Sequence, residues 1–184
     1  MKFLKIFLAI IVVLLVAVLG FYGYYGGFND ISFTTETQGG ETVVYEKVTG
    51  DYSQTPVYTD KIYNSLLNED KIETTRGFGI FYNNPKNTDV DKLRSEVGCI
   101  LDIEMDSLQR AHLSQKYNLK TLPKAKYIVT EFPYKGSVSI MVGIFKIYPA
   151  LENYSKENNI ATAGPVTEIY DVPNMKIIYR QEIK

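Results

Sequence analysis

An unbroken apolar run opens the chain. Ile6 to Leu19 consists almost wholly of Ile, Leu, Val, Ala and Phe, and no charged residue occurs between Lys5 and Asp30. Crossing a hydrocarbon core takes about 20 apolar residues, and the aromatic residues directly after the run suit the headgroup boundary. The pattern predicts a single-pass membrane anchor over residues 1–25.

The charges beside this run predict its orientation. Lys2 and Lys5 precede it, and positive flanking charge holds that end in the cytoplasm, so we expect an exoplasmic C-terminal domain, periplasmic or extracellular in a bacterium. The run is also typical of a cleaved signal peptide, because its densest part is short and Val18-Leu19-Gly20 resembles a cleavage site. No cysteine follows, which excludes a lipidated bacterial cleavage site.

The rest of the chain alternates between strand and helix patterns. Residues 26–40 are rich in Gly, Thr, Asn and Gln without periodicity, and we expect a linker there and one domain over 41–184. The first predicted β-α-β-β unit has a strand at 42–49, a helix at 53–68 and strands at 77–83 and 96–103. After a short helix at 106–118, the second unit has a strand at 126–132, a helix at 137–158 and strands at 166–171 and 175–182.

The second long helix has its own apolar pattern. Val138, Met141, Val142 and Phe145 are spaced as a buried stripe. Pro149 should kink this helix or restart it.

The two units match in sequence as well as in pattern. Lys61-Ile62-Tyr63 repeats as Lys146-Ile147-Tyr148, and Tyr82-Asn83-Asn84-Pro85 matches Tyr170-Asp171-Val172-Pro173. We therefore predict an α+β fold built from a duplicated β-α-β-β unit with pseudo-two-fold symmetry, behind one transmembrane helix. A groove between the two repeats is the expected place for a ligand.

Composition narrows the function classes. The 184 residues suffice for one domain beyond the anchor. A net charge of -1 and no basic run with interleaved aromatics argue against nucleic-acid binding. Cys99 is expected to be a small buried residue and His112 an exposed one, so we predict no metal site and no cofactor. Haem would have only His112 as an axial ligand.

The central strands carry the candidate binding residues. Side chains alternate along a strand, so Val166, Glu168 and Tyr170 should share one face, and Phe78, Ile80 and Tyr82 are the expected counterparts. The predicted ligand-binding residues are Glu168, Tyr170, Tyr82, Phe78 and Val166.

Glu168 is the chemically informative member of this set. A single carboxylate among aromatic rings suits an organic cation, and partial desolvation would raise its pKa, as a general acid or base also requires. Two alternatives stay open: Glu168 as an exposed strand residue paired with a lysine, and Tyr82 and Tyr170 as core packing.

Three segments resemble a known family. They are Gly79-Ile80-Phe81-Tyr82-Asn83-Asn84-Pro85, Val97-Gly98-Cys99-Ile100-Leu101 and Glu168-Ile169-Tyr170. The chain resembles the GyrI-like domains, with their SHS2-type fold, found in a bacterial gyrase inhibitory protein and in drug-responsive regulators. The resemblance implies that Glu168 binds lipophilic cations or, as in hydrolases of the family, acts with Tyr170 or Tyr82. In the regulators a helix-turn-helix domain precedes this module, whereas this chain has the predicted anchor there, so we do not expect it to be a transcription factor.

Within that family, the chain is most similar to a eukaryotic membrane-anchored ER-phagy receptor. The receptor's autophagy activity resides in a long disordered tail, and these 184 residues hold no counterpart to it. Our leading hypothesis is therefore a membrane-anchored module that binds a small amphipathic or cationic molecule. The alternatives are a protein-interaction platform without a ligand, which leaves a protein partner open, and a hydrolase using Glu168 and a cleft tyrosine.

Overall fold

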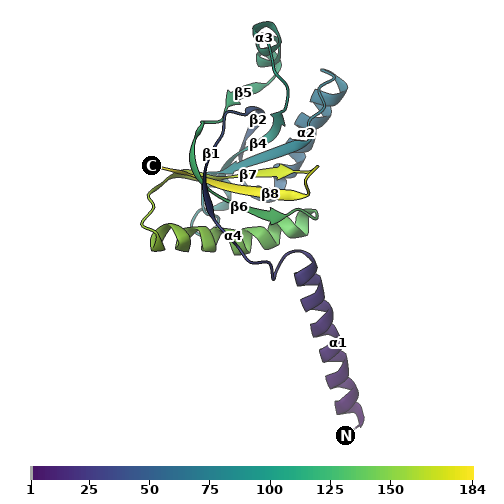
Figure 1. Cartoon of the computed structure of the whole chain (residues 1–184). Coiled ribbons are helices and arrows are strands. Elements are labelled where there is room, and N and C mark those ends of the chain that lie inside the picture. Colours follow the sequence, from purple (N-terminus) through teal and green to yellow (C-terminus); the bar gives the residue numbers. More distant parts are fainter. Residues whose placement is uncertain (1) are drawn as a thin grey trace.

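An eight-stranded antiparallel sheet forms the body of the protein in the computed structural model, which describes residues 2–184 (Figure 1). The strand order is β1-β6-β8-β7-β3-β4-β2-β5. The helices are α1 (Lys2–Tyr24), α2 (Thr55–Asn68), α3 (Ser107–Lys116) and α4 (Ser137–Glu157), with short 3₁₀ helices η1 (Tyr52–Gln54) and η2 (Val90–Lys92). The strands are β1 (Thr34–Gln38), β2 (Thr42–Thr49), β3 (Arg76–Phe81), β4 (Arg94–Leu101), β5 (Asn118–Thr121), β6 (Ala125–Pro133), β7 (Thr162–Asp171) and β8 (Lys176–Ile183).

The strand order confirms the predicted duplicated α+β fold. The elements β2, α2, β3 and β4 recur as β6, α4, β7 and β8. The strands β3 and β7 pair at the centre, and the order outward is β4-β2-β5 on one side and β8-β6-β1 on the other. The pseudo-two-fold axis therefore passes between β3 and β7.

Two strands were not predicted from the sequence. Strand β1 lies within residues 26–40, where a linker was expected, and it pairs with β6. Strand β5 pairs with β2, so each of these strands precedes one half in sequence and extends the edge of the other. Both are short and polar, as edge strands tend to be, and neither shows the apolar alternation that marks a half-buried strand.

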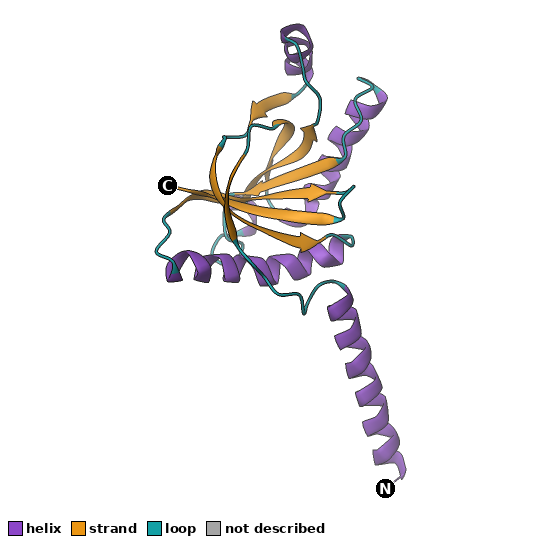
Figure 2. Ribbon diagram, viewed as in Figure 1, coloured by secondary structure: helices purple, strands orange, loops and turns teal. Residues whose placement is uncertain are grey.

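Both long helices cover the same face of the sheet. The pairing register aligns Val44, Cys99, Gly77, Tyr170 and Ile177 in one row across five strands, and directly opposed residues point to the same side. Helix α2 packs on the Val44 and Cys99 end of this row and α4 on the Ile177 end. Figure 2 shows α4 running along the sheet.

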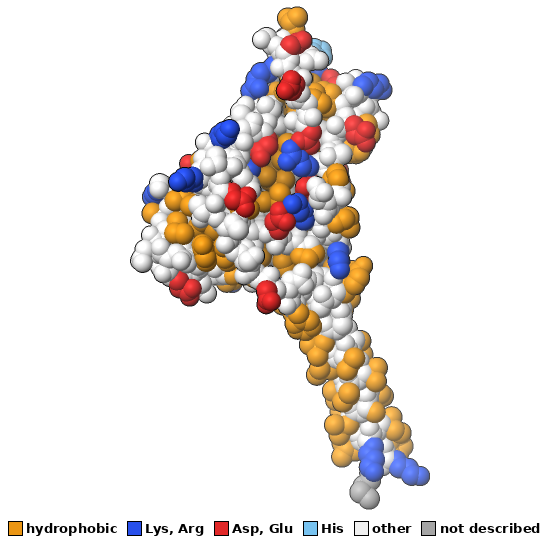
Figure 3. Space-filling view, viewed as in Figure 1, with side chains coloured by type: hydrophobic (Ala, Val, Ile, Leu, Met, Phe, Trp, Pro, Cys, Tyr) orange, Lys and Arg blue, Asp and Glu red, His pale blue; other side chains and the backbone are white. Residues whose placement is uncertain are grey.

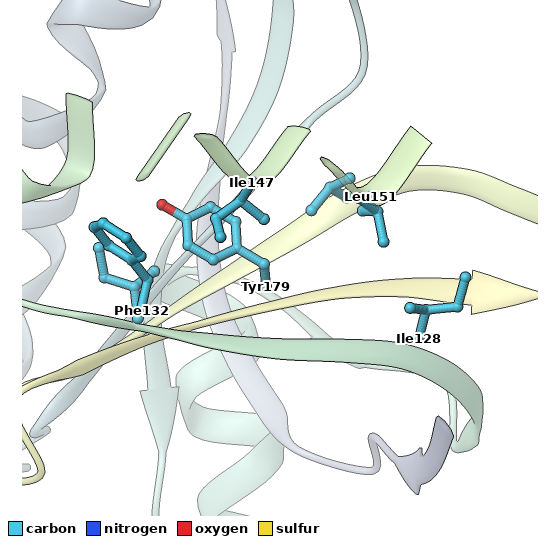
Figure 4. Packing of buried hydrophobic residues seen from close by; sticks show 7 residues of the cluster. Ile128, Phe132, Ile147, Leu151 and Tyr179 are labelled. Atoms are coloured by element: carbon cyan, nitrogen blue, oxygen red, sulfur yellow. The ribbon is translucent and has the colours of Figure 1, made fainter. Parts of the chain in front are cut away.

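The buried stripe of α4 differs from the predicted one. Ser139, Gly143, Ile147 and Leu151 are buried, whereas Met141 and Phe145 are 59% and 70% exposed. Small residues face the sheet because α4 approaches bulky side chains there: a Cβ at Gly143 would lie 2.4 Å from the Tyr179 hydroxyl and 3.2 Å from the Phe132 ring. Figure 4 shows Ile147 and Leu151 above Phe132, Tyr179 and Ile128. The helix continues through Pro149 without restarting.

The other face of the sheet has a separate core. It holds Phe78, Ile80 and Ile169, and Arg180 binds both carboxylate oxygens of Glu41 there at 2.8 and 2.9 Å. The β1–β2 and β5–β6 connections lie against each other, joined by backbone hydrogen bonds between residues 40–41 and 122. A Cβ at position 39 would sit 1.8 Å from a carbonyl oxygen, so this contact requires glycine.

Helix α1 stands apart from the sheet. None of its described side chains is buried, and Figure 3 shows hydrophobic side chains along its length with basic ones at the free end. By length and composition it could cross a membrane.

Candidate ligand-binding site

A large cleft lies between α2 and α4, over the central strands β3 and β7. Its volume is about 2100 Å³, above the roughly 300–1,000 Å³ of most small-molecule pockets. Aromatic side chains from both halves contribute to the walls; they include Tyr52, Tyr63, Phe81, Phe145, Tyr148 and Tyr170.

Glycines in β3 leave the floor of the cleft low. Gly79 lies opposite Glu168 and Gly77 opposite Tyr170, so neither residue of β3 adds a side chain to that face. The ring of Phe81 folds over Gly79, whereas a Cβ at Gly77 would reach the Tyr170 ring only at 3.5 Å. The first half therefore contributes space where the second half contributes polar groups.

Glu168 lies in this floor beneath two tyrosines. Its side chain is fully buried, and it accepts hydrogen bonds from the Tyr148 hydroxyl at 2.6 Å and the Tyr170 hydroxyl at 2.8 Å. Within residues 2–184, no lysine or arginine forms an ion pair with it. Any positive charge that balances Glu168 must come from a proton or from a ligand.

Burial and hydrogen bonding act on Glu168 in opposite directions. Loss of solvent raises the pKa of its carboxyl, and the two tyrosine hydroxyls partly offset this by stabilising the ionised form. Burial and the nearby carboxylate raise the pKa of Tyr148 and of Tyr170 well above the ordinary value. Both hydroxyls consequently remain donors near neutral pH.

Three of the five predicted site residues share this face, and two do not. Glu168, Tyr170 and Val166 lie on the helix side, and the alternative of an exposed Glu168 paired with a lysine is wrong. Phe78 lies opposite Ile169, in the core of the other face. The sequence match was shifted by one residue relative to the true register, and such a shift reverses the face of every side chain.

Tyr82 is displaced in the same way. It reaches the edge of the cleft and is 42% exposed, but burial and the Glu96 carboxylate raise the pKa of its hydroxyl. Glu96 lies opposite Ile80 and forms an ion pair with Lys120. The carboxylate that acts on Tyr82 is therefore that of Glu96, not that of Glu168.

Tyr148 is the site residue that sequence reasoning missed. It was noticed only as part of the repeat Lys146-Ile147-Tyr148, whose counterpart Tyr63 also lines the cleft. Helical periodicity alone did not show that this tyrosine, one residue after the buried Ile147, points toward the strand carrying Glu168.

Cys99 and His112 have the burial and exposure that the sequence predicts. Cys99 is buried, and burial raises the pKa of its thiol. The His112 side chain is 68% exposed on α3. Among residues 2–184, no group of three His, Cys, Asp or Glu side chains is arranged to hold a metal ion.

The sequence matches a known domain family over the whole of the sheet. The GyrI-like small molecule binding domain matches residues 32–183. The chain belongs to this family. Testis-expressed protein 264 homolog of Mus musculus is 32% identical over 135 residues, which cover 70% of this chain and 41% of that protein. Testis-expressed protein 264 of Homo sapiens is 36% identical over 100 residues, 52% of this chain and 32% of that one. The chain thus spans less than half the length of these curated relatives.

Solved structures share the fold of this GyrI-like protein. EcmrR in a DNA complex superposes with a TM-score of 0.60 at 9% identity, covering 93% of this chain and 65% of that one. An uncharacterized conserved protein from Listeria innocua gives 0.52 at 12% identity over 83% and 92%. SAV2435 bound to tetraphenylphosphonium gives 0.52 at 14% identity over 84% and 94%.

Proposed function

We propose that this protein is a membrane-anchored GyrI-like domain that binds a small amphipathic or cationic organic molecule in the cleft between its repeats. The observation that carries the proposal is Glu168, a buried carboxylate in an aromatic cleft with no basic partner in the described chain. A lipophilic cation would supply the missing charge, and the rings would contribute about 0.5–2 kcal/mol each through cation–π contacts. SAV2435, which shares the fold, was solved bound to such a cation.

The site residues that we propose are Glu168, Tyr148, Tyr170 and Val166. Because Glu168 is covered by the tyrosine hydroxyls, the cation would contact the rings, and the carboxylate would act through the two hydrogen bonds. The effective dielectric in the cleft is lower than in water, so the attraction between the Glu168 carboxylate and a cation held above the tyrosines would be stronger than at the same separation in water. Tyr82 and Phe78 were predicted from the sequence as ligand-binding residues but are not part of this proposal.

A thermal-shift titration of the full chain with tetraphenylphosphonium tests the proposal. The full chain is needed because a truncation at Gly40 would remove β1 from the sheet. Ligand binding to the folded state raises the melting midpoint, and we expect Glu168→Gln to lower the affinity about tenfold or more, or about 1.4 kcal/mol. Glu152→Gln, at an exposed glutamate on the cleft rim, is the matched control.

The neutral analogue triphenylphosphine oxide separates charge from shape. Equal affinity for the cation in Glu168→Gln and the wild type would remove the charge role. No stabilisation by either compound would overturn ligand binding and leave a protein-interaction role, as the resemblance to an ER-phagy receptor suggests.

A hydrolase is the second candidate, because Glu168 with its raised pKa and two adjacent hydroxyls could act as a general acid or base. It predicts turnover of an ester that disappears in Glu168→Gln but persists in Glu152→Gln. Equal rates of ester hydrolysis in Glu168→Gln and Glu152→Gln would eliminate the hydrolase hypothesis.

Orientation in the membrane is a separate part of the proposal. Lys2 and Lys5 should hold the N-terminus in the cytoplasm and place the domain on the exoplasmic side. Leu108 is 81% exposed on α3, and the native Cys99 is buried, so Leu108→Cys offers one accessible thiol. A membrane-impermeant maleimide should label it on intact cells, and labelling only after lysis would reverse the orientation.

A further inference from the structure

The segment around the end of α1 is hydrogen-bonded to α4 and to the loop that precedes α4. The Lys146 ammonium donates to the carbonyls of Gly27 and Asn29, both at 2.7 Å. The Lys135 ammonium donates to the Tyr24 carbonyl at 2.7 Å and lies 4.1 Å from the centre of the Tyr24 ring. Two lysines thus bind carbonyls at and just beyond the helix end, which would otherwise lack partners. No free spacer separates the apolar helix from α4.

The part of α4 beside this junction has an exposed apolar surface. Met141, Ile144 and Phe145 are 59%, 39% and 70% exposed, and they lie within about two turns of Lys146 along the same helix. Phe28, in the junction itself, is 64% exposed. These four residues, which we call the α4 apolar surface, are neither part of the core nor covered by another element.

The direction of α1 places this surface toward the bilayer. Figure 1 shows α1 leaving the domain on the side where α4 covers the sheet. The 23 residues of α1 rise about 35 Å, slightly more than a hydrocarbon core of about 30 Å. If α1 spans the membrane, its Tyr24 end reaches the headgroup region, and α4, bound to that end, lies at the same level.

We propose that the α4 apolar surface rests in the headgroup region of the membrane crossed by α1, so that the cleft opens at the bilayer surface and takes its ligand from the lipid phase. The inference rests on the anchor in the proposed function and adds the source of the ligand. Met141, Ile144 and Phe145 also line the cleft, so an apolar path runs from the membrane-facing side of α4 to the tyrosines above Glu168. The ligand class is therefore an amphiphile already partitioned into the membrane.

Tryptophan scanning tests this placement, because the chain has no native tryptophan. Each variant of the full chain is reconstituted into nanodiscs of phosphatidylcholine and phosphatidylglycerol, with or without brominated acyl chains that quench nearby tryptophan. We expect strong quenching and blue-shifted emission for Phe145→Trp and Ile144→Trp. Leu108→Trp, at a highly exposed site on α3, should be unquenched, and Val12→Trp, within α1, is the positive control.

Each outcome has a defined meaning. If Phe145→Trp behaves like Leu108→Trp while Val12→Trp is quenched, the anchor stands and the proposed contact is wrong. If Phe145→Trp is quenched but Ile144→Trp is not, α4 touches the membrane with the cleft turned away, and loading from the lipid phase is overturned. If Val12→Trp is not quenched, the anchor fails, and this inference fails with it, while ligand binding remains testable in solution.

Discussion

The two faces of the central strands β3 and β7 differ in how they are packed. On the far face, Phe78 and Ile80 of β3 and Ile169 of β7 pack together in a hydrophobic core. On the cleft face, the intervening residues Gly77 and Gly79 carry no side chain; the Phe81 ring folds over Gly79, so the open space lies at Gly77. The same strand thus builds a core with one set of alternate residues and the floor of the cleft with the other.

Each face also carries a carboxylate removed from bulk solvent, fully at Glu168 and partly at Glu41, in a different electrostatic setting. Glu41 is matched by Arg180, which lowers the pKa of Glu41 despite partial burial. Glu168 has only hydroxyl partners, and burial raises its pKa. The difference teaches that the charge of Glu41 is used within the protein, whereas that of Glu168 is left for a proton or a ligand.

Glu41→Gln should have the largest effect on stability. It leaves the Arg180 guanidinium, whose side chain is 1% exposed, without its charged partner, and unpairing a buried ion pair costs about 3–5 kcal/mol. Urea denaturation measures the loss. Glu152→Gln, which removes an exposed pair with Lys156, should leave the midpoint unchanged, and equal midpoints for both variants would show that the Glu41 pair is not structural.

Removing a hydroxyl above Glu168 should have the next largest effect. Tyr148→Phe and Tyr170→Phe each delete a hydrogen bond to a buried carboxylate, worth about 1.5–3 kcal/mol when the acceptor is charged. The loss of unfolding free energy should shrink at acid pH, where Glu168 is protonated. Tyr154→Phe is the matched control, since Tyr154 packs on Phe33 through its ring alone. A loss that did not vary with pH would assign it to packing.

Filling the glycine floor should weaken ligand binding without unfolding the domain. Gly77→Leu would place a side chain beside the Tyr170 ring and Thr59, and we expect an affinity for tetraphenylphosphonium about tenfold lower, or about 1.4 kcal/mol. Gly77→Ala adds only a Cβ at ordinary contact distance and serves as control. Calorimetric titration measures both, and undiminished binding in Gly77→Leu would place the ligand elsewhere in the cleft.

The sequence was sufficient to predict the repeated β-α-β-β architecture and the position of Glu168 on the central strands. The repeat identified β2, α2, β3 and β4 and their second copies, and strand alternation put Glu168 beside Tyr170 and Val166. It failed for Phe78 because an insertion between helix and strand left the register uncertain by one residue, and one residue exchanges the faces.

Other features depend on tertiary contacts that periodicity does not encode. Strands β1 and β5 are stabilised by pairing across the halves, and their own residues are mostly polar. In α4, close packing on Tyr179 selected Gly143 for the buried side and left Met141 and Phe145 outside, opposite to the hydrophobic expectation. Tyr148 reaches Glu168 because α4 packs on the face of the sheet that carries Glu168.

The smallest expected effect is a change in the pH dependence of stability, because the tyrosine hydroxyls partly offset the effect of burial on Glu168. This change compares the charge states of Glu168 and Glu41 directly. A raised folded-state pKa means that Glu168 favours folding most below its ordinary value of 4.5, and that this contribution is lost as pH rises through the raised pKa. Glu168→Gln should therefore gain stability relative to the wild type as pH rises. The lowered pKa of Glu41 has the opposite sign: its contribution is present above 4.5 and is lost as pH falls through the lowered pKa. Urea unfolding across this pH range should give differences of opposite slope for Glu168→Gln and Glu41→Gln, and parallel slopes would mean that the two faces do not differ in charge balance.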